Sequence, residues 1–562
     1  MLNLFTRGGQ LALHKYRMIK QVCLITILLS SLVGICAFAF QVYQQVSFDT
    51  LYAWIIDSFF DQNSSNRFNR TSNIEALFLR CFLTGLWSGL VSLLLIIGFF
   101  ILRGYTKSKK KFERGAQIVS PKKLKSLIKK RGLASDLNFG KLPLIKGKET
   151  SHILITGTTG SGKTNCLNAL LPQIRKRQDR AIIVDLTGNF ISKFYRENKD
   201  VLLNPLDSRS KSWSPWAECL CEAHFDTLAA AIVPQSTHID KFWENASKAL
   251  LSSALRKLRH TQDTQLLYHI LVRSNMETFS KFFEGTEAAT YTHQDGEKMT
   301  LSIRATLANH LQCFKYLKKE GAFSVRKWIT DTSLEMDPQW LFLSATPDTR
   351  ETLRPLLSCW LDTAINALMT LPEDSERRIW FIIDELPVLQ KLPSLHTAMA
   401  ESRKYGGCLI AGVQSFSQLV STYGQNTSQS ILDLFNTKVF FRNTDPNTTS
   451  WISRVLGETE TTEQVENLSY GANTMRDGIS LSQLRRTTPL VLPTEIAALK
   501  DLEAYVKFPG NFPISRIKTP YQNLPSVSKA FERVNPLELE NRFKFGSEHS
   551  FKQTLLRGEN GK

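Results

Sequence analysis

The stretch that decides the fold is HILITGTTGSGKTNCLNALL, which runs from His152 to Leu171. It begins with a short apolar run typical of a β-strand and ends with an amphipathic run typical of a helix. Between them lies a glycine-rich loop with the spacing G-x4-G-K-T, from Gly157 to Thr164. The backbone N–H groups of such a loop and the N-terminus of the following helix cradle phosphates. The stretch therefore predicts a nucleotide site at a strand-to-helix turn.

The side chains of this phosphate loop have separate expected roles. Lys163 is expected to place a positive charge on the β- and γ-phosphates, and Thr164 to supply a hydroxyl group to Mg²⁺. The predicted nucleotide-binding residues are Gly157, Thr158, Thr159, Gly160, Ser161, Gly162, Lys163, Thr164 and Asn165.

A nucleotide hydrolase also needs a carboxylate at the end of a neighbouring strand, and the stretch RRIWFIIDELP provides two. The five apolar residues 379–383 are typical of a strand that is buried on both faces. Asp384 is expected to hold Mg²⁺ through water, and Glu385 to polarise the attacking water. This arrangement is typical of ATPases rather than GTPases, so we expect ATP and Mg²⁺ as cofactors.

Three further strands end in polar residues. RAIIVDLTGN places Asp185 at such an end, GGCLIAGVQSFSQL places Gln414, and TKVFFRNTDP places Arg442. Polar residues at the carboxyl ends of parallel strands face the crevice where ligands bind. Gln414 is expected to sense the γ-phosphate, although capping of the next helix is an alternative, and for Asp185 a structural role is favoured. The order of elements predicts an α/β, RecA-like P-loop NTPase domain with a parallel sheet and helices on both faces.

Two uncharged apolar runs, Val22–Phe40 and Phe82–Leu102, are each near the roughly 20 residues that a membrane-spanning helix needs. A cleavable signal peptide is the alternative for the first run, but a second apolar run follows and favours a two-helix transmembrane hairpin. Four basic residues precede the first run and six follow the second. Both termini are therefore expected in the cytoplasm, with an outward-facing loop at 41–81 and a membrane anchor over 1–105.

The rest of the chain divides by composition and periodicity. The RecA-like nucleotide-binding domain, called the motor domain below, is expected at 106–221 and 328–520. Residues 222–327 are amphipathic at helical spacing, which predicts an inserted all-α domain, although helices that simply flank the sheet are an alternative. Residues 521–562 are polar and basic, which predicts a flexible or partner-binding tail.

The formal net charge of +19 is unevenly distributed. From Arg103 to Arg131 there are twelve lysines and arginines and a single acid, Glu113. Such an excess either anchors the chain to anionic lipid or attracts a polyanion such as DNA, and charge alone does not separate the two. The nine cysteines show no metal-binding pattern and are expected to be reduced.

Several stretches resemble a known family. GTTGSGKTN, LLNPLDSRSKSWSPWAE, DKFWENASKALL, SIRATLANH, IWFIIDELP, ESRKYGGCLIAGVQSFSQL and SYGANTMRDG are similar to motifs of the membrane-anchored coupling proteins of type IV secretion and conjugation, the TraD and TrwB family. The match runs from about residue 150 to 480 and resembles most the F-type TraD branch. A long C-terminal extension of that branch, used for docking on relaxosome proteins, is expected to be absent or much reduced here.

The resemblance implies a homo-hexameric ATPase of the bacterial inner membrane with its motor in the cytoplasm. It implies that relaxase-bound single-stranded DNA is taken to the type IV secretion channel, with relaxosome proteins as further partners. The helical segment would face the cytoplasm and meet the substrate. Two alternatives remain: a coupling ATPase that recruits protein effectors, and an FtsK-like pump for double-stranded DNA.

A catalytic arginine is expected from a neighbouring subunit, because the phosphate loop supplies no second positive charge beyond Lys163. Arg403 lies in ESRKYGG, just before the Gln414 strand, and the family resemblance points to the same arginine. The alternatives are a surface arginine that pairs with Glu401, or Arg442 as the inserted residue. The expected catalytic residues are thus Lys163, Glu385, Arg403 and Gln414, with Thr164 and Asp384 at the metal.

Overall fold

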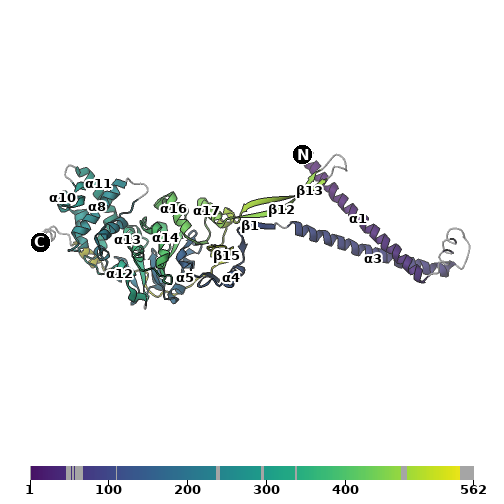
Figure 1. The fold of residues 1–562 in the computed structure, drawn as a ribbon, viewed down its shortest axis with the longest axis horizontal. Coiled ribbons are helices and arrows are strands. Elements are labelled where there is room, and N and C mark those ends of the chain that lie inside the picture. Colours follow the sequence, from purple (N-terminus) through teal and green to yellow (C-terminus); the bar gives the residue numbers. More distant parts are fainter. Residues whose placement is uncertain are drawn as a thin grey trace. The chain divides into compact units, whose positions relative to one another are not determined.

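The computed structural model describes residues 2–45, 52, 56, 67–108, 111–235, 241–292, 296–335, 338–469 and 478–544. Figure 1 shows its elements along the chain. The chain divides into two compact units. One comprises residues 1–114 and 459–488, and the other residues 115–458 and 489–562.

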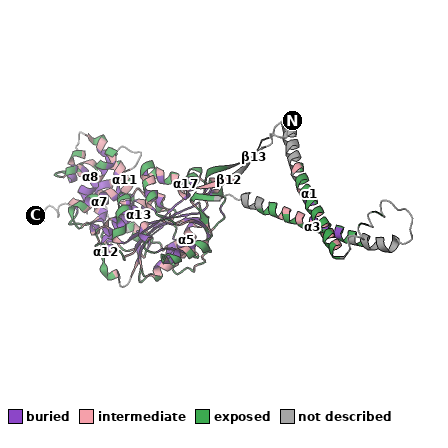
Figure 2. Cartoon of the chain, turned by 45° about the vertical axis from the view of Figure 1, so that its right-hand side comes forward, coloured by how far each residue is buried: buried purple, intermediate pink, exposed green. Residues whose placement is uncertain are grey.

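The first unit contains two long helices, α1 (Leu2–Gln45) and α3 (Arg67–Ser108). Within them, Ile19–Gln44 and Phe78–Leu102 are long and apolar enough to cross a membrane. Most of their apolar side chains are exposed (Figure 2), as expected for surface that lipid would cover. The two predicted spans lie inside these segments. Residues 46–51, 53–55 and 57–66 of the predicted outward-facing loop fall outside the described residues.

Small residues bring α1 and α3 together. The hydroxyl of Ser30 donates a hydrogen bond to the carbonyl oxygen of Gly85 at 2.6 Å. A Cβ atom at Gly89 would lie 2.8 Å from the Cβ of Ser30, and one at Gly85 would lie 3.1 Å from the Ser30 carbonyl oxygen. Glycines at such positions let two apolar helices approach closely, as small residues do between helices in membranes.

A three-stranded sheet completes this unit, with the order β1 (Lys111–Gly115), β12 (Glu458–Ser469) and β13 (Gly478–Pro489). Arg114 on β1 forms an ion pair with Glu460 on β12. Residues 470–477, which contain most of the SYGANTMRDG stretch, lie outside the described residues.

The second unit is built on a ten-stranded sheet with the order β2-β15-β14-β11-β5-β10-β9-β6-β8-β7. The neighbours from β11 to β7 are parallel, whereas β14 is antiparallel to both β11 and β15. The prediction of a parallel sheet is therefore wrong at this edge, because a short turn joins β14 to β15 and such a turn permits only antiparallel pairing. The strands are β2 (Ile118–Val119), β5 (Ile153–Thr156), β6 (Arg180–Asp185), β7 (Val201–Leu203), β8 (Trp340–Ser344), β9 (Ile379–Ile383), β10 (Gly407–Val413), β11 (Thr437–Phe440), β14 (Glu503–Lys507) and β15 (Ile514–Lys518).

Helices cover both faces of this sheet, as predicted. Every residue of β5 is buried. Its alternate side chains enter two cores: Leu154 packs in the one that contains α13, and Ile153 and Ile155 pack in the one that contains α5. The helices outside the segment between β7 and β8 are α4 (Pro121–Lys130), α5 (Lys163–Lys176), α6 (Asn189–Phe194), α13 (Arg350–Leu368), α14 (Leu395–Glu401), α15 (Phe416–Tyr423), α16 (Gln425–Leu434), α17 (Pro446–Leu456), α18 (Pro493–Ala497) and α19 (Pro536–Lys544), and β3 (Ala134–Phe139) pairs with β4 (Leu142–Ile145).

The segment between β7 and β8 is helical throughout its described elements. Its α-helices are α7 (Glu222–Ile232), α8 (Lys241–Lys257), α9 (Thr264–Tyr268), α10 (Met276–Phe283), α11 (Glu297–Leu311) and α12 (Val325–Thr330). Ser247 on α8 donates a hydrogen bond to the carbonyl oxygen of Ile303 on α11 at 3.2 Å. The buried side chains of this segment belong to the same core as one face of the sheet, so its status as a separate domain stays a prediction.

The segment predicted as a flexible or partner-binding tail is described up to Lys544. Its backbone is held along the sheet unit. Val527 donates a hydrogen bond to the carbonyl oxygen of Ser192 at 2.7 Å, and Val534 donates one to that of Leu206 at 3.1 Å. We call residues 519–544 the C-terminal strap. Residues 545–562 lie outside the described residues.

Candidate nucleotide-binding site

The phosphate loop connects β5 to α5 at the carboxyl edge of the parallel strands. Gly157 has a φ angle of +158°, and a Cβ atom there would lie 2.4 Å from the Ser161 hydroxyl and 2.7 Å from the Phe441 side chain. At Gly162, with φ +123°, a Cβ atom would lie 3.2 Å from the Leu502 side chain. Only glycine fits these two positions without a shift, so the spacing of the motif follows from the packing of the loop.

Lys163 begins α5 and is 7% exposed. Its Nζ donates a hydrogen bond to the carbonyl oxygen of Gly157, so the ammonium group lies inside the loop. Burial lowers the pKa of this ammonium group, and the negative charges of Glu385 and Asp384 oppose that shift. An ammonium group at this position could bind the phosphate oxygens of a nucleotide held by the loop.

Thr164 and Asp384 meet across the site, although 220 residues separate them in the sequence. The Thr164 hydroxyl donates to the carboxylate of Asp384 at 3.0 Å for Oδ2 and 3.3 Å for Oδ1. Burial raises the pKa of Asp384, whereas the Thr164 hydrogen bond and the charge of Lys163 lower it. A hydroxyl and a carboxylate are oxygen ligands of the kind that Mg²⁺ prefers, so these two side chains fit the ion.

Glu385, Gln414 and Thr159 form a second polar chain beside the loop. Gln414 Nε2 donates a hydrogen bond to Glu385 Oε2, and the Thr159 hydroxyl donates to Gln414 Oε1 at 3.4 Å. The other carboxylate oxygen, Glu385 Oε1, is buried and accepts no hydrogen bond among the described residues. A buried carboxylate with one free acceptor atom fits a group that takes or polarises a proton of a bound water. Burial raises the pKa of Glu385, and the charge of Lys163 opposes this.

Two neighbours of the site carry no signal in the sequence. Leu502 has a φ angle of +65°, which is strained for a branched side chain, and its N–H donates to the carbonyl oxygen of Ser161 at 2.9 Å. At Gly412 a Cβ atom would lie 1.8 Å from the carbonyl oxygen of Asp384, so only glycine lets β10 pass the end of β9. Leu502 thus fixes the phosphate loop from outside, and Gly412 permits the position of Asp384.

Asp185 and Arg442 have structural contacts. The Asp185 carboxylate accepts hydrogen bonds from the backbone N–H groups of Gly188 and Ile191, both at 2.8 Å, and so holds the turn into α6. The Arg442 side chain forms an ion pair with Asp501 at 2.8 Å. The carbonyl oxygen of Arg442 accepts a hydrogen bond from the N–H of Thr158, which makes it a neighbour of the phosphate loop.

Asn165 directs its side chain away from the loop. Its Nδ2 donates to the carbonyl oxygen of Pro520 at 2.9 Å, and its Oδ1 accepts from the N–H of Gln522 at 2.7 Å. The predicted nucleotide-binding residue therefore also holds the beginning of the C-terminal strap.

Arg403 lies at the opposite edge of the sheet from the phosphate loop. It precedes β10, Gln414 follows β10, and β10 is parallel to β5. Its side chain is exposed, and within the described part of the chain its guanidinium group forms no hydrogen bond or ion pair, including none with Glu401. The structure thus does not bring Arg403 to the phosphate loop of its own chain.

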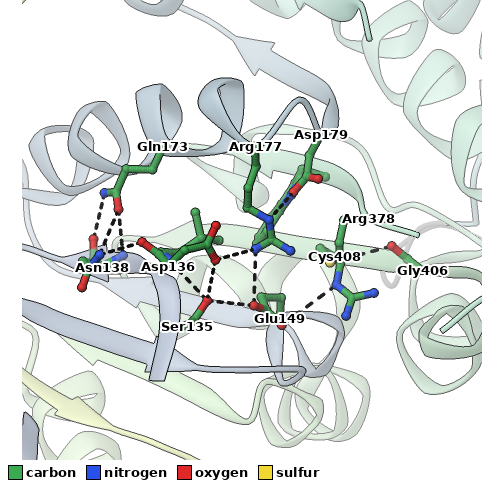
Figure 3. A network of polar contacts seen from close by, with 12 residues as sticks. Ser135, Asp136, Asn138, Glu149, Gln173, Arg177, Asp179, Arg378, Gly406 and Cys408 are labelled. Atoms are coloured by element: carbon green, nitrogen blue, oxygen red, sulfur yellow. Dashed lines mark hydrogen bonds and ion pairs between the residues drawn. The ribbon is translucent and has the colours of Figure 1, made fainter. Parts of the chain in front are cut away.

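A buried polar network stabilises this opposite edge (Figure 3). Glu149, which is 3% exposed, accepts hydrogen bonds from Ser135 at 3.1 Å and Arg177 at 3.4 Å, and lies 4.0 Å from the Arg378 guanidinium. These residues precede or flank the starts of the central strands. The network is structural and separate from the nucleotide site.

The fold and the site define a P-loop nucleotide-binding protein with two apolar N-terminal helices. A family model described as "Type IV secretion-system coupling protein DNA-binding domain" matches residues 136–520. The chain is 31% identical over 578 residues to the coupling protein TraD of Escherichia coli (strain K12), an alignment that covers 96% of this chain and 80% of TraD. It therefore belongs to the type IV secretion coupling proteins of the TraD and TrwB family.

Solved structures of the conjugative coupling protein TrwB have the same fold. TrwB without its N-terminal 70 residues, in complex with sulphate, superposes with a TM-score of 0.68 at 33% identity, covering 76% of this chain and 98% of that one. A TrwB complex with the non-hydrolysable ATP analogue ADPNP gives a TM-score of 0.67 at 32% identity, with the same coverage. A further TrwB structure contains ADP and Mg²⁺. Family membership and the RecA-like fold predicted from the sequence are thus confirmed.

Proposed function

We propose that this protein is a hexameric ATPase of the bacterial inner membrane that recruits relaxase-bound single-stranded DNA and drives its transfer through a type IV secretion channel. The observation that carries the proposal is the arrangement of two polar pairs around one phosphate loop, Thr164 with Asp384 and Gln414 with Glu385. A site of this kind is suited to cleave a nucleoside triphosphate. Membership of the coupling-protein family connects that cleavage with transfer.

Lys163 and the two polar pairs each have a separate role in the chemistry. Lys163 would bind the β- and γ-phosphate oxygens. Thr164, and Asp384 through water, would hold Mg²⁺, which when bound neutralises the charge that develops on the phosphates. Glu385 orients and polarises the attacking water through its free Oε1 atom. Gln414 holds Glu385 in place and links it to the loop through Thr159. The TrwB complex with ADP and Mg²⁺ supports the same pair of cofactors here.

The two apolar helices form the membrane anchor. Basic residues on the outer flanks of both spans favour cytoplasmic termini, with the motor domain in the cytoplasm. The helical segment 222–327 is then available to relaxase and relaxosome proteins on the cytoplasmic side, and the anchor to proteins of the secretion channel. A shared anchor also raises the local concentration of neighbouring motors and favours a ring.

Single-stranded DNA is the proposed cargo because the family resemblance implies it, and the large positive excess of the chain suits a polyanion. Four exposed lysines on α4, namely Lys122, Lys123, Lys129 and Lys130, contribute to it. Phosphate neutralisation by such residues releases counterions, so binding should be largely independent of sequence and fall steeply as salt rises. An affinity for single strands that does not change between low and physiological salt would contradict DNA as the cargo and favour protein effectors.

The proposal is tested by transfer and ATPase assays on Lys163→Ala. This variant is expected to remain in the membrane but to lose ATP hydrolysis and DNA transfer, because the phosphates lose their buried cation. Lys176→Ala, an exposed lysine at the other end of α5, is the matched control and should keep both activities. Wild-type rates of hydrolysis and transfer in Lys163→Ala would refute the proposed motor.

A further inference from the structure

The beginning of the C-terminal strap is fixed beside the first turn of α5. Asn165 directly follows Thr164, and its amide holds both the Pro520 carbonyl oxygen and the Gln522 N–H. The residue between these two anchors is Tyr521, which is 76% exposed. A large aromatic side chain is therefore held outward next to the phosphate loop, with its backbone fixed on both sides.

The same turn is supported from a second direction. The strained residue Leu502 donates its N–H to Ser161 of the phosphate loop at 2.9 Å, and its carbonyl oxygen accepts the N–H of Thr519 at 2.8 Å. Thr519 is 1% exposed, in contrast to Tyr521 two residues later. One strained residue thus connects the phosphate loop to the base of the turn. The position of Tyr521 relative to the loop is determined by three separate segments of the chain.

We infer that Tyr521 is the stacking surface for the base of the bound nucleotide, an inference that rests on the proposed nucleotide site. Bound phosphates would lie at the N-terminus of α5, and the side chain of Thr164 points to Asp384 on one side. Asn165 is the next residue, about 100° further around the helix, and points to the strap. On this arrangement, the sugar and base of a bound nucleotide would extend from the phosphates toward the side that carries the exposed Tyr521. An exposed ring on a fixed turn there provides the flat apolar face on which a base stacks.

Stacking uses the π-face that every base has, so this surface would bind purine nucleotides with little discrimination between adenine and guanine. Asn165 acts as a positioning residue, because its contacts with the strap determine where the ring stands. Asn165 would then have two roles in the phosphate-loop motif: it lies beside the bound phosphates, and it positions the Tyr521 ring.

The test compares nucleotides with a ligand that has no base, using the full-length protein in detergent micelles. Tyr521→Ala is expected to weaken binding of ADP and of GDP by about tenfold each, because base–aromatic stacking is lost. Tyr521→Phe is expected to bind both like the wild type. Inorganic tripolyphosphate should bind equally well to all three proteins. Val527→Ala, an exposed apolar residue of the same strap (59% exposed), is the matched control and should change neither affinity.

Each contrary result has one meaning. Unchanged ADP affinity in Tyr521→Ala, while Lys163→Ala loses ADP, would overturn the inference and leave the proposed nucleotide site intact. Equal weakening of ADP and tripolyphosphate would also overturn it, since the effect would then lie in the loop. Failure of the wild type to bind ADP would refute the proposed site itself and the inference with it. Asn165→Ala should weaken ADP binding when Tyr521 is present but have no further effect when combined with Tyr521→Ala. Equal weakening in both backgrounds would contradict the positioning role of Asn165.

Discussion

Gln414 donates a hydrogen bond from Nε2 to Glu385 Oε2, and this contact joins the end of β10 to the residue that we propose as the water-activating base. Because Gln414 Oε1 also accepts a hydrogen bond from the Thr159 hydroxyl, the base is linked to the phosphate loop. Gln414→Ala breaks both contacts but leaves Lys163 and Thr164 in place. We expect the rate of ATP hydrolysis to fall by roughly 10²-fold, with nucleotide affinity nearly unchanged, as measured by steady-state hydrolysis and equilibrium binding.

A double-mutant comparison separates this role from a general loss of structure. Glu385→Gln should bind ATP but fail to cleave it. If Gln414 acts through Glu385, adding Gln414→Ala to Glu385→Gln should cost almost nothing further, because residues that act as a unit are not additive. Fully additive losses would show that Gln414 works independently of Glu385.

The contact between Thr164 and Asp384 predicts a specific loss of the metal. Asp384→Asn keeps an oxygen near the Thr164 hydroxyl but removes the negative charge that attracts Mg²⁺. The Mg²⁺ concentration that gives half-maximal hydrolysis should rise by about tenfold or more, because ligand charge determines much of the affinity for a hard cation. Asp501→Asn, in the exposed partner of Arg442, is the control and should keep the wild-type dependence on Mg²⁺. An unchanged half-maximal concentration in Asp384→Asn would exclude this carboxylate from the metal site.

Much of the sheet is predictable because its central strands are continuous apolar runs. Runs such as IWFII and GCLIAGV alternate with helices, and that order requires crossover connections and parallel pairing. The loop spacing and the position of Asp384 after its run then place Thr164 and Asp384 at the same edge of the sheet. Local patterns suffice here, because each residue lies at a defined end of a regular element.

The parts that escape prediction depend on contacts between distant segments. The strap has no periodicity of its own, and it is ordered by partners such as Gly188, where a Cβ atom would lie 2.7 Å from the Cβ of Ala530. The positive φ angle of Leu502 has no signal in its residue type. Asn165 belongs to a phosphate-loop motif, and no pattern in that motif indicates a role in holding residue 520.

The pH dependence of stability is predicted to include a contribution from His152, which directly precedes β5 and is 2% exposed. Its Nδ1 accepts the N–H of Leu409 at 3.2 Å, and its Nε2 lies 2.9 Å from the carbonyl oxygen of Met399. A neutral ring that donates from Nε2 satisfies both contacts. Burial lowers the pKa of this imidazole from 6.5 to about 4, although the Met399 contact opposes the shift.

Between pH 6.5 and about 4, His152 is therefore protonated in the unfolded chain but neutral in the folded chain. The contribution of His152 to stability is complete above pH 6.5 and is lost progressively as the pH falls to about 4. This loss amounts to about 3 kcal/mol. Urea unfolding between pH 4 and 7 should show a shallower pH dependence in His152→Gln than in the wild type, whereas the exposed His396→Gln should keep the wild-type slope. Equal slopes in wild type and His152→Gln would contradict the assignment.

The C-terminal strap is expected to loosen when Arg209 is removed. The Arg209 guanidinium pairs with Asp207 at 2.7 Å and donates to the Ser528 hydroxyl and the Lys529 carbonyl oxygen, both at 2.9 Å. Arg209→Ala should make trypsin cut after Lys529 several-fold sooner, because local opening governs cleavage. Mass spectrometry of timed digests measures this. Arg196→Ala, a half-exposed arginine outside these contacts, is the control, and equal digestion of both variants would argue against the clamp.

The last prediction concerns Arg403, which we propose completes the site of a neighbouring subunit. The phosphate loop has one buried cation, Lys163, and the guanidinium of Arg403 is exposed at the opposite edge of its own sheet. In a ring, that exposed edge is available to the loop of the next subunit. An inserted guanidinium that stabilises the charge on the transferring phosphoryl group is worth roughly 10³–10⁵ in rate. The rival, Arg442, lies beside its own loop and is already paired with Asp501.

A mixing experiment distinguishes these possibilities. Arg403→Ala and Lys163→Ala should each be inactive alone. If Arg403 acts on its neighbour, rings that contain both proteins should recover part of the ATPase activity, since some interfaces then combine an intact loop with an intact arginine. Crosslinking of differently tagged subunits verifies that the rings are mixed. No recovery in verified mixed rings, or full activity of Arg403→Ala alone, would remove Arg403 from the mechanism, and the same mixing with Arg442→Ala would then test its rival.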